Sequence, residues 1–238
     1  ITTYVEAPPG SGLGSSSALV VALVAAIAEY YAIPLGEYDI AEYAVEIERN
    51  ICKLPGGKQD QFAAAFGGFN FIEFLPDGRT IVNPLRLNPK TQNMLELSTV
   101  LYYVGKPRMD ERVIENTTLN LRNNDEETLQ ATHRIKSAAI EYKRSLLLGD
   151  VDKICESMNT YWKNKIKTNK NVVSPELLDS YEFALQNGAK AAKISGAGGG
   201  GHVALFTDFE NRHRLISSLK KRKIGRVVPF KFVKHVVD

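Results

Sequence analysis

Stretches with helical spacing of apolar residues alternate with short strand-like runs along this chain of 238 residues. Residues 1–7 alternate apolar and polar side chains, which is typical of a half-buried β-strand. Residues 15–32 are apolar on nearly every side, so we expect a buried helix there. Residues 37–52 show the three- and four-residue spacing of an amphipathic helix, and residues 60–66 predict a short helix.

The rest of the chain predicts a hairpin followed by a mixed second half. Residues 69–75 and 80–85 flank Pro76-Asp77-Gly78 and predict a β-hairpin. After the hairpin, strands are expected at 98–104, 191–195, 202–206 and 227–233. Helices are expected at 110–117, 127–148, 151–167 and 175–187, with one more between the last two strands. This mixed order of strands and helices indicates an α+β protein.

Length and composition restrict the class of protein. The length suits two modest domains, which we place at residues 1–88 and 89–238. The net charge of +3 and the lack of a basic stripe argue against a nucleic-acid partner, and the apolar run 18–28 is too short to cross a membrane. Cys52 and Cys155 are far apart, which predicts reduced thiols, no metal cluster and a cytoplasmic location.

The most informative segment is Pro8-Pro9-Gly10-Ser11-Gly12-Leu13-Gly14-Ser15-Ser16-Ser17-Ala18, between the expected first strand and first helix. Alternating glycines let a backbone turn tightly and present successive N–H groups, and a helix start favours a bound anion. A serine-capped turn is the alternative, but a cap needs far fewer glycines and serines. We therefore interpret the segment as a phosphate cradle.

Two common nucleotide-binding motifs do not fit this cradle. No lysine follows the glycines, as a P-loop requires, and Ser15 stands where a dinucleotide fingerprint has its third glycine. That fingerprint does occur at Gly196, Gly198 and Gly201. The apolar run that follows is a strand, however, whereas the fingerprint precedes a helix.

Three ordered motifs resemble those of the GHMP kinases, the family of galactokinase, homoserine kinase and mevalonate kinase. The cradle is similar to the second motif, Lys58-Gln59-Asp60-Gln61 to the catalytic Asp-Gln segment, and 193–201 to the C-terminal glycine motif. Residues 57–74 and 228–232 look most like the members that phosphorylate D-glycero-D-manno-heptose 7-phosphate. The resemblance implies two domains, an N-terminal ribosomal-S5-like domain and a C-terminal ferredoxin-like domain, with the active site in the cleft between them.

The resemblance also implies site residues. The ATP phosphates would be bound by Pro9, Gly10, Ser11, Gly12, Leu13, Gly14, Ser15, Ser16 and Ser17, and by Gly196, Gly198 and Gly199. Ser16 and Glu48 would hold Mg²⁺, which prefers hard oxygen ligands. Asp60 would accept the proton of the acceptor hydroxyl or orient that hydroxyl, with Lys58 assisting.

Each of these roles has a structural alternative. Ser15 or Asp60 could be a helix N-cap, and Glu46 is the neighbouring candidate for the metal site. Lys58 could lower the pKa of Asp60, contact a phosphate, or be solvated. The second glycine run could serve close packing between domains, although its excess of glycines suggests contact with a ligand or with the first cradle.

Other cationic and histidine side chains carry less information. The cations that could contact a phosphate already on the acceptor are Arg86, Lys106, Arg108 and Lys193, for which surface solvation is the alternative. The four histidines are His133, His202, His213 and His235. They have neither metal-ligand spacing nor a nucleophile partner, so no role is predicted for them.

The resemblance implies an ATP- and Mg²⁺-dependent kinase that phosphorylates C1 of a small sugar phosphate, and it leaves a homodimer open. Another GHMP activity, such as a fucose, galactose or mevalonate kinase, is one alternative. A non-catalytic ligand sensor with the same fold is another. The family carries a further N-terminal motif that this sequence lacks, so we expect the first domain to be incomplete and these residues alone to be inactive.

Overall fold

The structure, a computed structural model, describes residues 1–7, 11–105, 110–168, 173–196, 201–222 and 224–232, and the side chains of all of these except 110–113. Contacts divide the chain into two compact units. The first contains Ile1–Pro9, Gly14–Arg86 and Phe232–Asp238, and the second contains Gly10–Leu13 and Leu87–Lys231. The glycine-serine segment is therefore shared, because the chain passes from the second unit to the first at the Leu13–Gly14 peptide bond.

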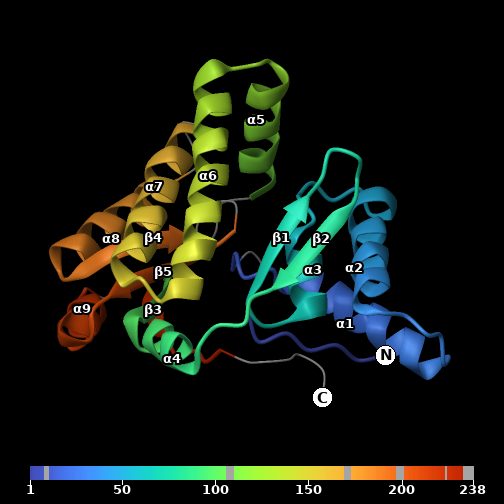
Figure 1. The fold of residues 1–238 in the computed structure, drawn as a ribbon, viewed down its shortest axis with the longest axis horizontal. Coiled ribbons are helices and arrows are strands. Elements are labelled where there is room, and N and C mark those ends of the chain that lie inside the picture. Colours follow the sequence, from blue (N-terminus) through green and yellow to red (C-terminus); the bar gives the residue numbers. More distant parts are fainter. Residues whose placement is uncertain (8–10, 106–109, 169–172, 197–200, 223, 233–238) are drawn as a thin grey trace. The chain divides into compact units, whose positions relative to one another are not determined.

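The first unit combines helices with a hairpin (Figure 1). Its elements are α1 (Ser15–Tyr30), α2 (Glu37–Val45), the π-helical turn η1 (Glu46–Ile51), α3 (Gln59–Phe66), β1 (Asn70–Phe74) and β2 (Thr80–Pro84). The expected hairpin and short helix are thus confirmed. The expected helix 37–52 is present as one continuous helical segment, in which the π-helical turn η1 follows directly on α2.

Two predictions for the start of the chain are wrong. Residues 1–7 form no strand, because a strand needs a hydrogen-bonded neighbour and none of the described residues pairs with them. Helix α1 is not buried all round, since only Ser17, Val21 and Ala28 are buried. One side of α1 packs against α2 and α3, and within this chain the other sides remain partly or fully exposed.

A small aromatic core holds the hairpin onto the helices of the first unit. Phe62 of α3 is 1% exposed and clusters with Ala41 of α2 and Val82 of β2. The Tyr38 ring meets the Phe66 ring edge-on, with 4.8 Å between centroids. The Tyr38 hydroxyl oxygen also accepts a hydrogen bond of 2.9 Å from the backbone N–H of Val82. Helix α3 is thereby fixed on both sides, which fixes the residues in its first turn.

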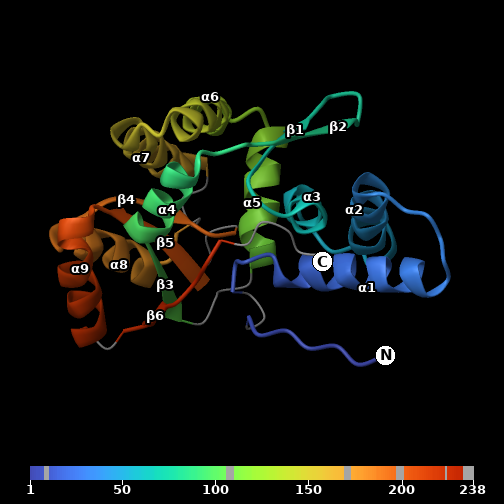
Figure 2. The same cartoon turned by 60° about the horizontal axis from the view of Figure 1, so that its bottom comes forward.

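The second unit is a four-stranded antiparallel sheet with helices (Figures 1 and 2). Its strands are β3 (Thr99–Gly105), β4 (Ala189–Ile194), β5 (Gly201–Thr207) and β6 (Arg226–Val228), in the order β4-β5-β3-β6. Its helices are α4 (Pro89–Ser98), α5 (Asp110–Arg122), α6 (Glu126–Leu148), α7 (Val151–Thr168), α8 (Pro175–Gln186) and α9 (Phe209–Lys221). Both views show α6 and α7 side by side.

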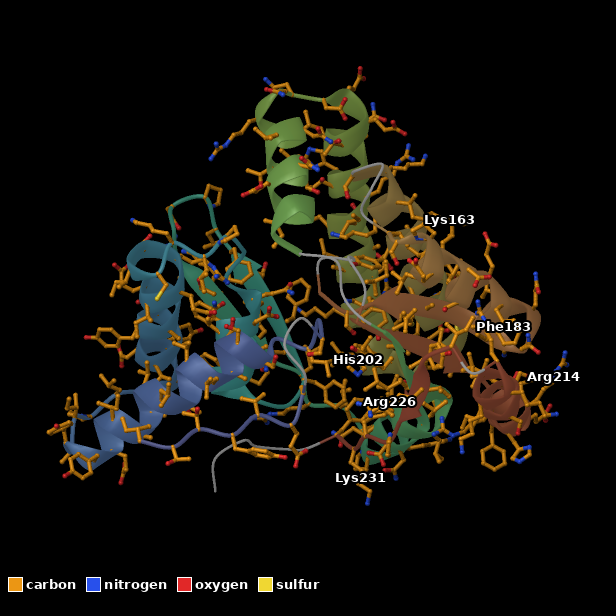
Figure 3. All side chains as sticks on the ribbon, turned by 180° about the vertical axis from the view of Figure 1, so that it is seen from behind. Lys163, Phe183, His202, Arg214, Arg226 and Lys231 are labelled. Carbon is orange, nitrogen blue, oxygen red and sulfur yellow. The ribbon has the colours of Figure 1, made fainter. Side chains whose placement is uncertain are left out.

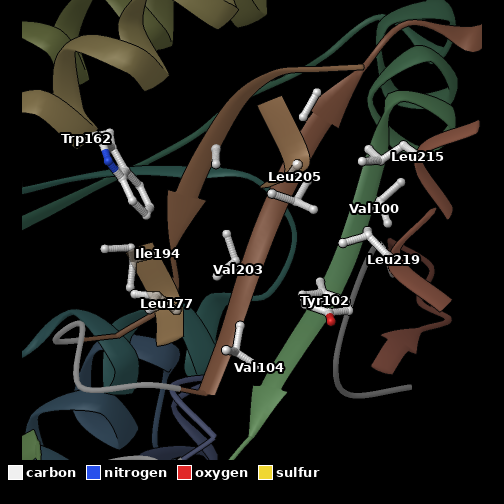
Figure 4. Close-up of a cluster of buried hydrophobic side chains, with 13 residues drawn as sticks. Val100, Tyr102, Val104, Trp162, Leu177, Ile194, Val203, Leu205, Leu215 and Leu219 are labelled. Carbon is white, nitrogen blue, oxygen red and sulfur yellow. The ribbon is translucent and has the colours of Figure 1, made fainter. Parts of the chain in front are cut away.

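The core of the second unit lies against the two central strands. Alternate residues of β3 are buried, and β5 is buried along nearly its whole length. Figure 4 shows Leu215 and Leu219 of α9 beside Val100 and Tyr102 of β3. Leu177 of α8 and Trp162 of α7 belong to the same cluster. The packed sheet gives the β4–β5 connection a rigid base.

Every strand and helix predicted for the second unit is present, with ends shifted by up to five residues. Helix α4 was not predicted. Asn88 caps it by accepting a hydrogen bond of 2.8 Å from the N–H of Lys90, and Pro89 occupies the first helical position. No helix in the described part of the chain is long and apolar enough to span a bilayer.

Candidate active site

The first unit brings together three of the predicted site residues, Ser16, Glu48 and Asp60. Ser16 lies in the first turn of α1, and its hydroxyl donates a hydrogen bond of 3.2 Å to Oε1 of Glu48. Glu48 lies in the π-helical turn and is only 3% exposed. Burying a carboxylate costs free energy unless it is hydrogen-bonded, so a buried glutamate at this position indicates a structural or functional role.

The buried Glu48 lies within a π-helical turn. The N–H of Cys52 donates to the carbonyl of Ile47, five residues back, at 2.8 Å. Such turns widen a helix locally and often occur at functional sites. Glu46, the alternative metal ligand, is exposed and accepts a hydrogen bond from Asn50. The geometry therefore favours Glu48 over Glu46.

Asp60 lies in the first turn of α3 and packs against Gly14. A Cβ atom added at Gly14 would be 3.1 Å from Cγ and 3.3 Å from Oδ1 of Asp60, so a side chain there would press on the carboxylate. Gly14 also has a φ of +68°, which disfavours any other residue. Neither Ser15 nor Asp60 is a helix N-cap. The N-caps of α1 and α3 are Gly14 and Lys58, and neither helix has a side-chain cap.

The other predicted residues of this unit are less constrained. Lys58 is exposed and forms no ion pair with Asp60 in the described structure, and Arg86 is also exposed. Ser15 is partly buried, whereas Ser17 is 4% exposed and faces the protein. The predicted residues Pro9 and Gly10 lie outside the described ranges.

The second unit contains the remaining part of the cradle. A Cβ atom at Gly12 would lie 2.6 Å from the carbonyl oxygen of Ser195, and one at Gly196 would lie 2.9 Å from Cα of Gly12. The two glycine segments therefore meet backbone to backbone. Leu13 is 43% exposed, whereas Ser11 is 1% exposed and its hydroxyl has no hydrogen-bond partner among the described residues. An unpaired hydroxyl beside these glycines fits a ligand that brings its own polar atoms.

His202 anchors this part of the cradle and was missed from the sequence. Its backbone N–H donates to the carbonyl of Ser11 at 3.1 Å, and its ring Nδ1 lies 2.8 Å from the same oxygen. The Tyr103 ring packs between the His202 ring and the guanidinium of Arg226, at 4.9 and 5.5 Å. In Figure 3, His202 and Arg226 lie close together and away from Lys163 and Arg214. The position of His202 directly after a glycine run was the available signal.

Arg49 was also missed, although it fixes the loop before Asp60. Its Nε and Nη2 donate to the carbonyl of Gly57 at 3.0 and 2.9 Å, and its Nη1 donates to the carbonyl of Leu54 at 3.3 Å. Gly56 leaves room for the guanidinium, since a Cβ there would lie 2.9 Å from Nη2. A loop without secondary structure needs such partners for its carbonyls.

The cationic candidates of the second unit do not form a cluster in the described structure. Lys193 is exposed and lies over the Tyr161 ring, with its Nζ 4.9 Å from the centroid. Lys106 and Arg108 lie outside the described ranges, as do Gly198 and Gly199. The described residues contain no group of three or more His, Cys, Asp or Glu that could hold a metal ion.

Comparison with known proteins shows which family the chain is similar to. The GHMP kinases N-terminal domain matches residues 1–68, and the GHMP kinases C-terminal domain matches residues 142–224. The chain is 43% identical over 235 residues to D-glycero-alpha-D-manno-heptose 7-phosphate kinase of Campylobacter jejuni, a match covering 99% of this chain and 68% of the relative. It is 30% identical over 218 residues to a galactokinase of Thermococcus kodakarensis, covering 83% of this chain and 62% of the relative.

A solved structure supports the same relationship. The crystal structure of a D-glycero-D-manno-heptose 1-phosphate kinase from Bacteroides thetaiotaomicron is 37% identical, with a TM-score of 0.76, over 97% of this chain and 64% of that one. The chain thus spans about two thirds of the length of these relatives. The fold is α+β, as the order of strands and helices predicted, with the two GHMP kinase domains that the motif resemblance implied. Together, the motifs, the fold and these relatives show that the chain belongs to the GHMP kinase family.

Proposed function

We propose that this chain carries the phosphoryl-transfer site of an ATP-dependent sugar-phosphate kinase. The acceptor is D-glycero-D-manno-heptose 7-phosphate, and the product is the 1,7-bisphosphate. The observation that carries the proposal is the buried Glu48 carboxylate hydrogen-bonded to Ser16, in the same unit as Asp60 and Gly14. The acceptor follows from the name of the Campylobacter jejuni relative, which specifies a heptose 7-phosphate, whereas the name of the solved structure specifies a heptose 1-phosphate.

Phosphoryl transfer needs positioning and charge stabilisation more than covalent work by the protein. The C1 hydroxyl oxygen attacks the γ-phosphorus, the bond from that phosphorus to the β–γ bridging oxygen breaks, and ADP leaves. Asp60 takes the hydroxyl proton or orients the hydroxyl. Backbone N–H groups after Gly12 and Gly14 bind the phosphates, where side chains would block the close packing described above.

The residues present fit Mg²⁺. One buried carboxylate and one hydroxyl, Glu48 and Ser16, lie within hydrogen-bond distance of each other. Mg²⁺ in kinases is held by one or two protein oxygens together with substrate phosphates and waters, which matches this small donor set. When bound, the ion neutralises charge on the transferring phosphoryl group.

The described cysteines are free thiols, which fits a reducing cytosolic setting.

A substrate panel tests this proposal. Full-length protein is assayed with ATP and Mg²⁺ against the heptose 7-phosphate, galactose, fucose and mevalonate, with Asp60→Asn alongside. We expect turnover of the heptose phosphate alone, lowered at least 100-fold in Asp60→Asn. Turnover of a different acceptor would keep the kinase and refute the substrate. ATP binding without turnover of any acceptor would favour a ligand sensor instead.

A further inference from the structure

Gln61, the residue after Asp60, is completely buried in the site that the proposed function uses. It lies in α3 with 0% exposure, and its Nε2 donates a hydrogen bond to Oε2 of Glu48. A carboxylate can only accept hydrogen bonds, so this contact fixes which end of the amide faces Glu48. The orientation of Gln61 is therefore determined by its partner.

Glu48 is held at both of its oxygens. Oε1 accepts from the hydroxyl of Ser16, and Oε2 accepts from Gln61. A carboxylate bonded at one oxygen can still rotate about its last torsion, which is broad for glutamate. The second bond stops this rotation. Gln61 thus keeps Oε1 of Glu48 beside the Ser16 hydroxyl, so that the two predicted metal ligands stay together.

The other end of the Gln61 amide is unsatisfied. Its Oε1 is buried and has no hydrogen-bond partner among the described residues. A buried acceptor without a donor is a cost that proteins rarely retain, except where a ligand or water supplies the donor. A divalent cation that keeps part of its hydration shell brings water molecules, and these can donate.

We propose that Gln61 is a positioning residue for the metal site: its Nε2 orients Glu48, and its Oε1 accepts a hydrogen bond from a water of the bound divalent cation. This role rests on the metal site of the proposed function, because it needs a cation at Ser16 and Glu48. It differs from a purely structural role, in which Gln61 only satisfies a buried carboxylate and the metal affinity does not depend on it.

The test is the Mn²⁺ dissociation constant of full-length protein, measured by EPR with a non-hydrolysable ATP analogue present. Gln61→Met keeps the approximate size and removes both hydrogen bonds. We expect a 10- to 100-fold weaker Mn²⁺ affinity, the range found for residues that orient metal ligands. Gln130→Met is the matched control, because Gln130 donates a hydrogen bond of 3.1 Å to the Glu126 carboxylate on the surface of α6. This control should bind Mn²⁺ as the wild type does.

The outcomes separate the two proposals. If the wild type phosphorylates the heptose phosphate and Gln61→Met binds Mn²⁺ within twofold of the wild-type affinity, only the role of Gln61 is overturned. A wild type that binds Mn²⁺ but phosphorylates no acceptor overturns the kinase function, and weaker Mn²⁺ binding by Gln61→Met would still support the positioning role. Should Gln61→Met fail to unfold cooperatively, Gln61→Asn retains the amide on a shorter side chain. Wild-type Mn²⁺ affinity in that variant likewise overturns the role.

Discussion

Replacing Gly12 by alanine should disrupt the cradle, for two separable reasons. Gly12 has a φ of +73°, and left-handed backbone costs a residue with a Cβ about 1–2 kcal/mol. The new Cβ would also lie 2.6 Å from the carbonyl oxygen of Ser195. Overpacking of this kind typically costs about 1–3 kcal/mol. The sum is a loss of about 2–5 kcal/mol of stability. It falls on the backbone contact between the two glycine segments.

Two other glycines in the chain are matched controls. Gly78, in the β1–β2 turn, has a φ of +88° and nothing within 4 Å of an added Cβ, so Gly78→Ala incurs only the backbone cost. Gly57 has open space and no left-handed φ, so Gly57→Ala should be neutral or stabilise by up to about 1 kcal/mol. The three variants therefore separate backbone strain from steric overlap.

The assay is steady-state kinetics with ATP varied, together with thermal unfolding. A loss of 2 kcal/mol at the phosphate site corresponds to roughly a 30-fold rise in the KM for ATP, at 1.4 kcal/mol per factor of ten. We expect at least this rise in Gly12→Ala, and no more than a twofold change in Gly78→Ala and Gly57→Ala. A KM for ATP in Gly12→Ala within threefold of that in Gly78→Ala would refute the proposed contact between cradle and glycine loop.

Three further predictions concern other sites. Arg49→Met should speed hydrogen exchange in the loop ending at Gly57, because each lost hydrogen bond is worth about 1 kcal/mol. Unchanged exchange would contradict the role of Arg49 in holding this loop. Hydrogen bonds from the backbone and side chain of Asn211 lower the pKa of Asp208 below its usual 3.8, so the stability it gives is complete above pH 3.8 and is lost as the pH falls below that value. The difference in Tm between wild type and Asp208→Asn should shrink over that range, and a constant difference would oppose this. Burial raises the pKa of the Cys155 thiol to about 11, so a thiol reagent at pH 8 should label exposed Cys52 first, and rapid labelling of Cys52→Ser would contradict the burial.

The sequence predicted most elements because their signals are local. The hairpin was marked by Pro76-Asp77-Gly78, and α8 by the Ser174 cap followed by Pro175. The expected strand at residues 1–7 failed because alternation states only that a segment could pair, not that a partner exists. Helix α4 was missed because its apolar positions are few, although Asn88-Pro89 was a legible start signal.

The candidate site shows the same division. Motif resemblance placed Ser16, Glu48 and Asp60 in one site, and the structure brings all three into the first unit. The motif includes Gln61 but gives it no role, and it does not indicate His202, because the roles of both depend on hydrogen bonds between residues 13 and 191 positions apart. Nor could it indicate the π-helical turn that contains the buried Glu48. Spacing along a sequence does not record such contacts.

The most direct test of the proposed reaction is a ³¹P NMR spectrum of full-length protein incubated with ATP, Mg²⁺ and D-glycero-D-manno-heptose 7-phosphate. The proposed function predicts a new phosphate resonance coupled to the anomeric proton at C1, formed in step with ADP and abolished in Asp60→Asn. ADP formation without that resonance, no reaction by the wild type, or full turnover by Asp60→Asn would contradict it.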